Sequence, residues 1–303
     1  MKENFYSNGK LLITGEYAVL DGAKAFAIPT KYGQSLVISK NDSGTIEWTS
    51  FDNEQNSWFK AIVSIPDLNV LFTTNEEIAN TLSKILEAAR NLNSDFLITD
   101  TGLEIATHLG FPKDWGLGSS STLINNIANW AEIDPYSLLE QTFGGSGYDL
   151  ACAANNKPIV YQLINDKATV EKVDFKVPFS DKLFFVYLDK KQNSRDAIKN
   201  YRAQSFDKDI LIDSISTITE KTIKSKSLLE FELLIKEHEA LLSNVLKIKT
   251  VQENLFSDYT YGVVKSLGGW GGDFVLATGT KKTPEYFKSK GFNIVIPYQE
   301  MIY

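Results

Sequence analysis

The sequence predicts an α+β fold in two domains, and three observations carry this prediction. Runs of apolar residues at helical spacing and short strand-like runs both recur along the 303 residues. Their connections are too irregular for a strict strand–helix alternation, which favours α+β over a parallel α/β sheet. Pro178 and Ser180 mark a boundary before a strongly apolar strand, so we expect domains over residues 1–178 and 179–303.

The composition of the chain argues against several classes of binding partner and indicates its cellular setting. The 31 basic and 38 acidic residues give a net charge of −7, which argues against a nucleic acid or an anionic membrane as the main partner. Cys152 is the only cysteine, so no intrachain disulfide forms and a reducing, cytoplasmic setting is expected. Neither a signal peptide nor an apolar run of about 18 residues is present, so no membrane segment is expected.

The first half of the chain is expected to alternate strands with one long helix. Apolar residues at helical spacing predict a helix over residues 76–91, and residues 50–75 read as loop with one or two short strands. The expected strands are residues 11–13, 25–29, 34–39, 46–48, 96–99 and 103–106.

Residues 114–130 organise the rest of the chain. Gly116 and Gly118 are followed by three serines and then by apolar residues at helical spacing, which predicts a glycine turn leading into a helix. The first amides of a helix have no intrahelical partner, so such a turn suits a phosphate group. A serine-capped helix with no ligand is the alternative from this stretch alone. The Walker spacing is absent.

The second half predicts two further glycine-rich turns, at residues 144–147 and 268–272, among mixed elements. Asp134–Pro135 is a helix start, because aspartate caps the first turn and proline suits its first position. The other expected elements are a hairpin over 158–163 and 168–174, strands over 183–188, 274–277 and 292–297, and helices over 194–204, 207–223, 227–247, 256–266 and 284–290.

Four segments, residues 8–22, 112–124, 144–153 and 265–277, resemble in order the signature segments of the GHMP kinases. This family includes galactokinase, homoserine kinase, mevalonate kinase and phosphomevalonate kinase. Gly-Tyr-Asp-Leu-Ala at 147–151 is similar to the signature of the GYDIA subgroup, with Leu for Ile. The resemblance implies ATP and Mg²⁺ as cofactors and an active site in a cleft between a first domain carrying the phosphate loop and a ferredoxin-like second domain.

The resemblance also implies roles for individual residues. Asp149 corresponds to the catalytic base and Lys10 to the lysine that pairs with it, while Ser120 and Glu140 correspond to Mg²⁺ ligands. The nucleotide-binding positions are Gly116, Leu117, Gly118, Ser119, Ser120, Ser121, Gly268, Gly269, Gly271 and Gly272. The acceptor-binding positions are Glu16, Tyr17, Ser146, Gly147, Lys191 and Arg195.

The chemistry of these residue types is compatible with the implied roles. A cation beside Asp149 would hold its carboxylate ionised, ready to take or orient the proton of an acceptor hydroxyl. Lys10 would also stabilise charge on the transferred phosphoryl group. A structural ion pair, or two solvated charges, is the alternative for these two residues. Trp115 and Trp270 stand where the family usually has small residues, and either pack or narrow a pocket.

The resemblance implies an ATP-dependent kinase of the mevalonate pathway that phosphorylates phosphomevalonate. Mevalonate is the alternative acceptor, because residues 191–195 are similar to the Asn-Thr-Arg segment of mevalonate kinases. An enzyme like diphosphomevalonate decarboxylase and a non-catalytic binding member of the fold are further alternatives. The expected partners are the small-molecule acceptor and ATP, and the expected assembly is a monomer or a homodimer.

Overall fold

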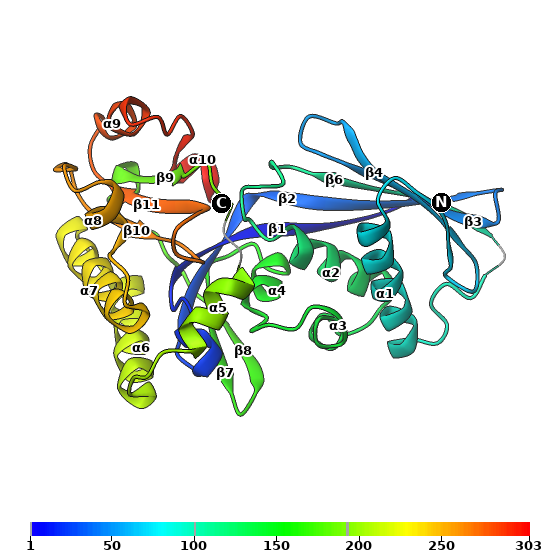
Figure 1. Cartoon of the computed structure of the whole chain (residues 1–303), viewed down its shortest axis with the longest axis horizontal. Coiled ribbons are helices and arrows are strands. Elements are labelled where there is room, and N and C mark those ends of the chain that lie inside the picture. The colour runs from blue at the N-terminus through cyan, green and yellow to red at the C-terminus, as the bar shows by residue number, and fades with distance from the viewer. Residues whose placement is uncertain (1, 100, 192–193) are drawn as a thin grey trace. The chain divides into compact units, whose positions relative to one another are not determined.

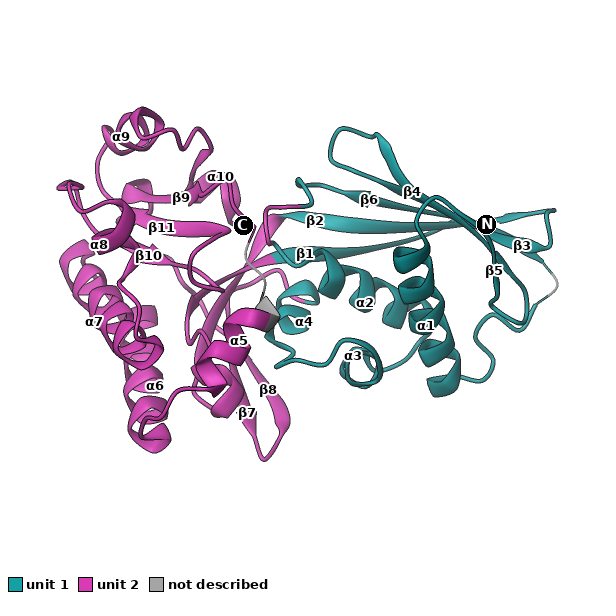
Figure 2. Cartoon of the chain, viewed as in Figure 1, with its two compact units in different colours: residues 1–9, 32–113, 117–154 teal, residues 10–31, 114–116, 155–303 magenta. Residues whose placement is uncertain are grey.

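The computed structural model describes residues 2–99, 101–191 and 194–303 (Figure 1). The chain forms two compact units, coloured separately in Figure 2. Unit 1 comprises the residues up to Gly9, Tyr32–Lys113 and Leu117–Ala154. Unit 2 comprises Lys10–Lys31, Asp114–Gly116 and Asn155–Tyr303.

This division differs from the single boundary near residue 178 that the sequence predicts. Strand β1 (Lys2–Thr14) and strand β2 (Ala25–Asn41) each begin in one unit and end in the other. The hairpin of β7 (Ile159–Ile164) and β8 (Lys167–Lys172) belongs to unit 2, because residues 25–27 of β2 pair antiparallel with residues 159–161 of β7. Because each of these two strands contributes residues to both units, a boundary at one place along the chain does not describe the division.

Unit 1 is a sheet with helices packed on it. Its strands are β3 (Thr45–Phe51), β4 (Ser57–Ser64), β5 (Val70–Thr73), β6 (Gly102–Leu109), residues 2–9 of β1 and residues 34–41 of β2. The central β6 pairs antiparallel with β2 and parallel with β3. Alternate residues of β3, such as Ile46 and Trp48, are buried in one core with apolar residues of the helices, as the period of two requires.

Two of the unit 1 helices begin after a capping side chain, and the sequence predicts one of these caps, Asp134. Helices α1 (Glu76–Leu92) and α3 (Pro135–Thr142) start after Asn75 and Asp134, whose side chains accept hydrogen bonds from the third following amide. Helix α2 (Ser119–Trp130) and helix α4 (Tyr148–Ala153) instead start after glycines in the left-handed conformation. Cys152 is buried in α4, as expected of a small core residue.

Unit 2 contains an antiparallel sheet of four strands in the order β10 (Val264–Ser266), β11 (Phe274–Thr278), β9 (Leu183–Tyr187) and β12 (Val295–Pro297). It also contains the hairpin β7 (Ile159–Ile164) and β8 (Lys167–Lys172). The helices and single turns are η1 (Ala18–Asp21), η2 (Ser180–Lys182), α5 (Ser194–Arg202), α6 (Lys208–Lys224), α7 (Leu228–Leu246), α8 (Val251–Leu255), α9 (Thr283–Ser289) and α10 (Tyr298–Met301). The mixed elements confirm the α+β class.

Two local predictions are wrong, and a third is correct in its residues but not in its division into two strands. Residues 96–97 lie in a turn and residues 98–99 are irregular, in place of a strand, because Arg90 of α1 donates hydrogen bonds to the carbonyls of Phe96 and Leu97. The helix expected at 256–266 is absent, since Phe256 enters the core directly after α8 and residues 264–266 pair with β11. The two strands expected over 25–39 are one strand, β2. No helix among the described residues combines the length and apolarity needed to cross a membrane.

Candidate active site

The glycine turn at 116–118 leads into α2, as the sequence predicts. Gly118 has φ 90° at the N-cap and provides no side-chain cap, and the first intrahelical bond runs from the Thr122 amide to the Gly118 carbonyl, at 3.0 Å. The amides of residues 119–121 therefore precede the helical hydrogen-bond ladder. This arrangement fits the anion site expected for a nucleotide phosphate, and the exposed Ser120 hydroxyl lies in the same turn.

Helix α2 is fixed in unit 1 by buried side-chain hydrogen bonds. The Thr122 hydroxyl donates to the Gln34 side chain at 2.7 Å, and the Asn126 amide donates to the Gln34 carbonyl at 2.9 Å. Asn125 donates to the Ser7 hydroxyl at 2.8 Å. Because buried polar groups are costly to leave unpaired, these bonds fix both the position and the rotation of α2 on β1 and β2.

Within unit 2, Gly116 lies directly against Asp273, which follows the third glycine turn. A Cβ on Gly116 would stand 2.4 Å from the Asp273 carboxyl carbon, and Gly116 has φ 67°. The backbone of Asp273 is held in turn, because its amide donates to the Lys190 carbonyl at 2.6 Å and its carbonyl accepts from Leu188 at 2.8 Å. The structure thus brings together the start of the phosphate turn, the third glycine turn and the segment after β9.

Aromatic packing fixes the residues before Gly116 in the same unit. The Trp115 ring meets Phe274 edge-on at 5.4 Å between centroids, and the Tyr187 hydroxyl donates to the Asp114 carbonyl at 3.1 Å. Trp270 is 5% exposed and belongs to a buried cluster with Tyr17. Both tryptophans therefore pack against neighbouring side chains, and Trp270 also lines a pocket, so both alternatives that the sequence left open apply to Trp270.

The turn at residues 15–17 contacts the third glycine turn. The Tyr17 hydroxyl accepts a hydrogen bond from the Trp270 backbone amide at 3.0 Å, and its ring stacks on Tyr201 at 5.4 Å. Gly15 has φ 96°, and a Cβ there would stand 2.6 Å from Ala25. Tyr17 itself has φ 60°, uncommon for an aromatic residue, so the surrounding contacts impose this conformation.

Glu16 is buried, with 1% of its surface exposed, although we predict that it contacts the acceptor. Its carboxylate forms an ion pair with Lys265 and lies 3.2 Å from His238 Nε2. Burial raises its pKa to about 6, and Lys265 limits that rise. The role of Glu16 as an acceptor ligand stays a prediction. The contacts that the structure describes for its carboxylate are with Lys265 and His238 of unit 2.

The remaining predicted site residues are distributed over both units. Asp149 is half-buried in the first turn of α4, and Glu140 is exposed near the end of α3. Lys10 is half-buried on the part of β1 that belongs to unit 2, so its pairing with Asp149 joins residues of different units and stays a prediction. Lys191 is exposed, and Arg195 lies in α5 with its side chain outside the described part.

Ser146 and Gly147 lie directly before α4, and Gly147, at φ 85°, is its N-cap, so their role in acceptor binding stays a prediction. Over the described ranges, no group of three or more histidine, cysteine, aspartate or glutamate side chains is placed to hold a metal ion. Ser120 and Glu140 as Mg²⁺ ligands therefore stay predictions. Mg²⁺ bound to nucleotide phosphates needs only one or two protein ligands.

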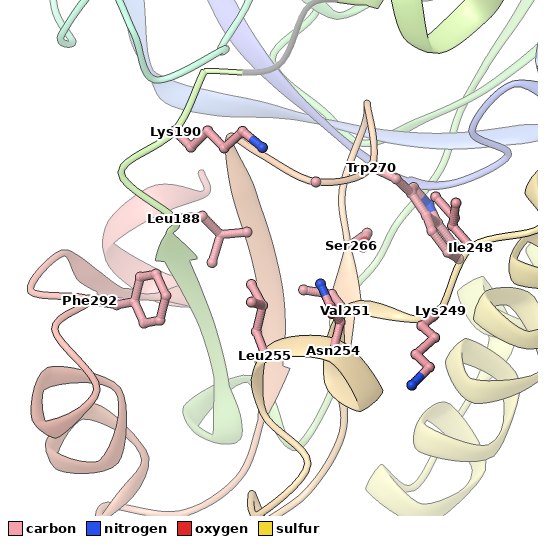
Figure 3. Close-up of a pocket in the computed structure, with 11 residues that line it drawn as sticks. Leu188, Lys190, Ile248, Lys249, Val251, Asn254, Leu255, Ser266, Trp270 and Phe292 are labelled. Carbon is pink, nitrogen blue, oxygen red and sulfur yellow. The ribbon is translucent and has the colours of Figure 1, made fainter. Parts of the chain in front are cut away.

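A pocket of about 600 Å³ lies inside unit 2 beside the third glycine turn (Figure 3). Figure 3 shows Leu188 and Phe292 on one side and Trp270 and Ile248 on the other. The full lining is Leu188, Lys190, Ile248, Lys249, Val251, Asn254, Leu255, Ser266, Trp270, Gly271 and Phe292. The pocket therefore shares Trp270 and Gly271 with the third glycine turn, and Leu188 and Lys190 with the segment that holds Asp273.

Sequence reasoning missed Lys265, His238 and Glu239, which surround Glu16. Lys265 carried a signal, because it is a single charge within the otherwise uncharged run Val263–Leu267 that leads into the third glycine turn. A lysine in such a strand is fully buried only when it is paired, so it pointed to a buried carboxylate elsewhere. Nothing in the sequence indicated that Glu16 is the partner.

No protein-family model and no curated protein matches the sequence. Solved structures do match. A crystal structure of mevalonate kinase superposes with a TM-score of 0.69 at 16% identity, over 97% of this chain and 96% of that one. Phosphomevalonate kinase from Streptococcus pneumoniae, in complex with phosphomevalonate and AMPPNP, matches with a TM-score of 0.68 at 14% identity, over 95% of each chain.

A third match is mevalonate diphosphate decarboxylase from Staphylococcus aureus, with a TM-score of 0.64 at 13% identity, over 99% of this chain and 96% of that one. The superpositions establish a shared fold. At identities this low, they do not choose among the reactions of the three proteins. All three carry the fold of the GHMP family, and the matches extend over almost the whole of each chain. This chain therefore has the GHMP kinase fold, as the resemblance of its signature segments predicts.

Proposed function

We propose that this protein is an ATP-dependent small-molecule kinase that transfers the γ-phosphoryl group of ATP to phosphomevalonate. The observation that carries the proposal is the contact of Gly116 with Asp273. It joins the start of the phosphate turn to the third glycine turn, in a chain whose fold matches the mevalonate-pathway kinases. Any side chain at residue 116 would displace Asp273, so the packing requires glycine at this place.

The residues present fit a nucleotide. The amides at the start of α2 are not used by the helix, and the helix dipole favours negative charge there. The Ser120 hydroxyl and the Glu140 carboxylate are both exposed and would hold Mg²⁺. When bound, Mg²⁺ neutralises charge on the phosphates. The backbone of the third glycine turn would close over the phosphates and the acceptor.

The proposed chemistry assigns proton handling to Asp149. Its carboxylate would accept the proton of the acceptor hydroxyl or orient that hydroxyl toward the γ-phosphate, while the Lys10 ammonium would pair with Asp149 and stabilise the transferred group. Phosphoryl transfer depends mainly on positioning and on charge neutralisation. The Asp149 and Lys10 side chains and the amides at the start of α2 are groups of the kinds that provide both. Lys191 and Arg195 would bind the anionic end of the acceptor.

Mevalonate is the alternative acceptor, because residues 191–195 are similar to the corresponding segment of mevalonate kinases. The test is ADP release, measured by a coupled assay, with phosphomevalonate, mevalonate, galactose and homoserine. We expect turnover of phosphomevalonate above the other three. Parallel measurement of released CO₂ from diphosphomevalonate separates a decarboxylase. If ADP is not released with any of the mevalonate compounds, the proposal is refuted and a non-catalytic binding protein is favoured.

The assembly state of this proposed enzyme is a monomer or a homodimer. Light scattering coupled to gel filtration distinguishes the two by mass, since one chain has a mass of 33.9 kDa.

A further inference from the structure

Four ionisable side chains form a buried charge cluster in unit 2: Glu16, His238, Glu239 and Lys265. Their exposed fractions are 1%, 0%, 3% and 0%. Glu16 follows β1, His238 and Glu239 are consecutive on α7, and Lys265 is central in β10. Charges this deep cost several kcal/mol each to remove from water, so their arrangement must be specified by the rest of the unit.

Lys265 is the centre of the buried charge cluster. Its ammonium forms an ion pair with Glu16 and donates to the Ser266 carbonyl at 2.7 Å. A Glu239 oxygen lies 3.8 Å from the same nitrogen. Burial raises the pKa of Glu239 to about 8, so at neutral pH this carboxyl keeps its proton and the cluster contains one cation and one anion.

His238 completes the cluster as a neutral side chain. Its Nε2 accepts a hydrogen bond from the Gly15 amide at 2.9 Å, so in the neutral ring the proton is on Nδ1. Burial, and secondarily the charge of Lys265, hold the pKa of His238 well below its usual value. The ring therefore anchors the turn at Gly15 through a hydrogen bond, while Lys265 anchors the next residue through a charge.

The anchored turn is connected to the third glycine turn by two routes. Tyr17, the residue after Glu16, accepts the Trp270 amide hydrogen bond at 3.0 Å. Lys265 lies on β10, which is followed after Leu267 by the glycines of the third turn. One ion pair therefore ties the turn at residues 15–17 to the strand that delivers the third glycine turn.

We propose that Glu16 and Lys265 are positioning residues, whose buried ion pair sets the 15–17 turn and the 268–272 turn relative to each other for acceptor binding. This inference rests on the proposed function for its kinetic consequence. Stability alone is a weak reason for such a pair, because replacing both partners of a buried ion pair by uncharged groups is often neutral or stabilising. A geometric role accounts for charges at this position better.

The experiment compares four variants with the wild type: Glu16→Gln, Lys265→Met, the double variant with both changes, and Tyr17→Phe. Glu220→Gln is the matched control, because it breaks the exposed Lys24–Glu220 pair in the same unit. Hydrogen exchange of the Gly15 and Trp270 backbone amides is read by NMR, the melting temperature by calorimetry, and the acceptor KM and kcat by ADP release.

Each single charge variant is expected to melt at a lower temperature, because it leaves an unpaired buried charge. The double variant is expected to regain most of the melting temperature, yet to exchange the Trp270 amide at least about tenfold faster than wild type, the effect of losing roughly one net hydrogen bond. We also expect its acceptor KM to rise about tenfold or more with kcat changed less. Tyr17→Phe should accelerate exchange at Trp270, and the control should match wild type.

A double variant whose Trp270 amide exchanges at the wild-type rate would overturn the inference. That result would show that uncharged side chains replace the ion pair fully, as expected of a pair with only a structural role. Wild-type acceptor KM in the double variant would overturn it as well. The exchange measurement needs no turnover, so it tests the positioning of the two turns even where wild-type protein phosphorylates no acceptor. Absence of turnover in wild type refutes the proposed function and leaves the exchange result to decide on the positioning.

Discussion

Glu239 predicts a specific dependence of stability on pH. Burial raises the pKa of its carboxyl from 4.5 to about 8 in the folded protein, while Lys265 opposes that rise. Between these values the folded state retains a proton that the unfolded state has released. The folded state then binds more protons, so the free energy of unfolding falls as pH rises. The stabilisation is complete below pH 4.5 and is lost as pH rises through 8.

The size of this effect follows from the width of the window. One pKa unit corresponds to about 1.36 kcal/mol, so a rise of about 3.5 units amounts to the order of 5 kcal/mol across the whole range. Glu239→Gln replaces the protonated acid by an uncharged side chain of the same shape. We therefore expect the variant and wild type to have similar stability near pH 5. By pH 8 the variant should be more stable by several kcal/mol.

Urea unfolding at pH 5, 6, 7 and 8 measures this difference. Glu16 and His238 also titrate in the buried charge cluster, so the comparison uses the gap between variant and wild type, not either curve alone. Glu220→Gln is the control, because hydrogen bonding to Lys24 lowers the pKa of Glu220 and no titration is expected above pH 5. A gap for Glu239→Gln that stays constant from pH 5 to 8 would refute the assignment of a proton to Glu239.

Three further predictions concern the phosphate turn, the base and a helix cap. Gly116→Ala should lower stability by more than the roughly 1–2 kcal/mol of a left-handed alanine, since its Cβ would meet Asp273. Gly44→Ala, at φ 66° with open space around it, is the matched control in calorimetry, and equal losses would contradict the contact. Asp149→Asn should reduce ADP release about 100-fold or more with an unchanged melting temperature; a reduction under about threefold would exclude a general base. Asn75→Ala should destabilise α1 by about 1 kcal/mol in urea unfolding, because its side chain caps the Ile78 amide, and an unaltered midpoint would show that the cap contributes nothing.

The sequence predicts the local elements of this fold better than their arrangement. The cap at Asp134 and the glycine turn before α2 are local signals, and each corresponds to an observed helix start. The strand expected at 96–99 is absent because side-chain hydrogen bonds from Arg90 at the end of α1 hold the carbonyls of Phe96 and Leu97 in a turn. The interleaving of the two units depends on the pairing of residues 25–27 with 159–161, which no local pattern encodes.

The candidate site divides in the same way. The glycine turns are recognisable from the sequence because a positive φ and a close backbone approach require glycine, as at Gly116. The partners of Glu16 are not, because His238 and Lys265 lie more than 200 residues away along the chain and meet it only through tertiary packing. The signature segment at residues 8–22 therefore singles out Glu16 in the sequence. Its burial cannot be predicted in this way, because it depends on the tertiary packing of unit 2.

The interleaving of the two units has a consequence for attempts to dissect the protein. Unit 2 needs residues 10–31 and 114–116 as well as everything after 154, so no single cleavage of the polypeptide releases either half intact. A fragment ending near residue 178 would keep β7 and lose β9, β10 and β11. We therefore expect limited proteolysis to yield either the whole protein or small peptides, and expression of isolated halves to give insoluble material.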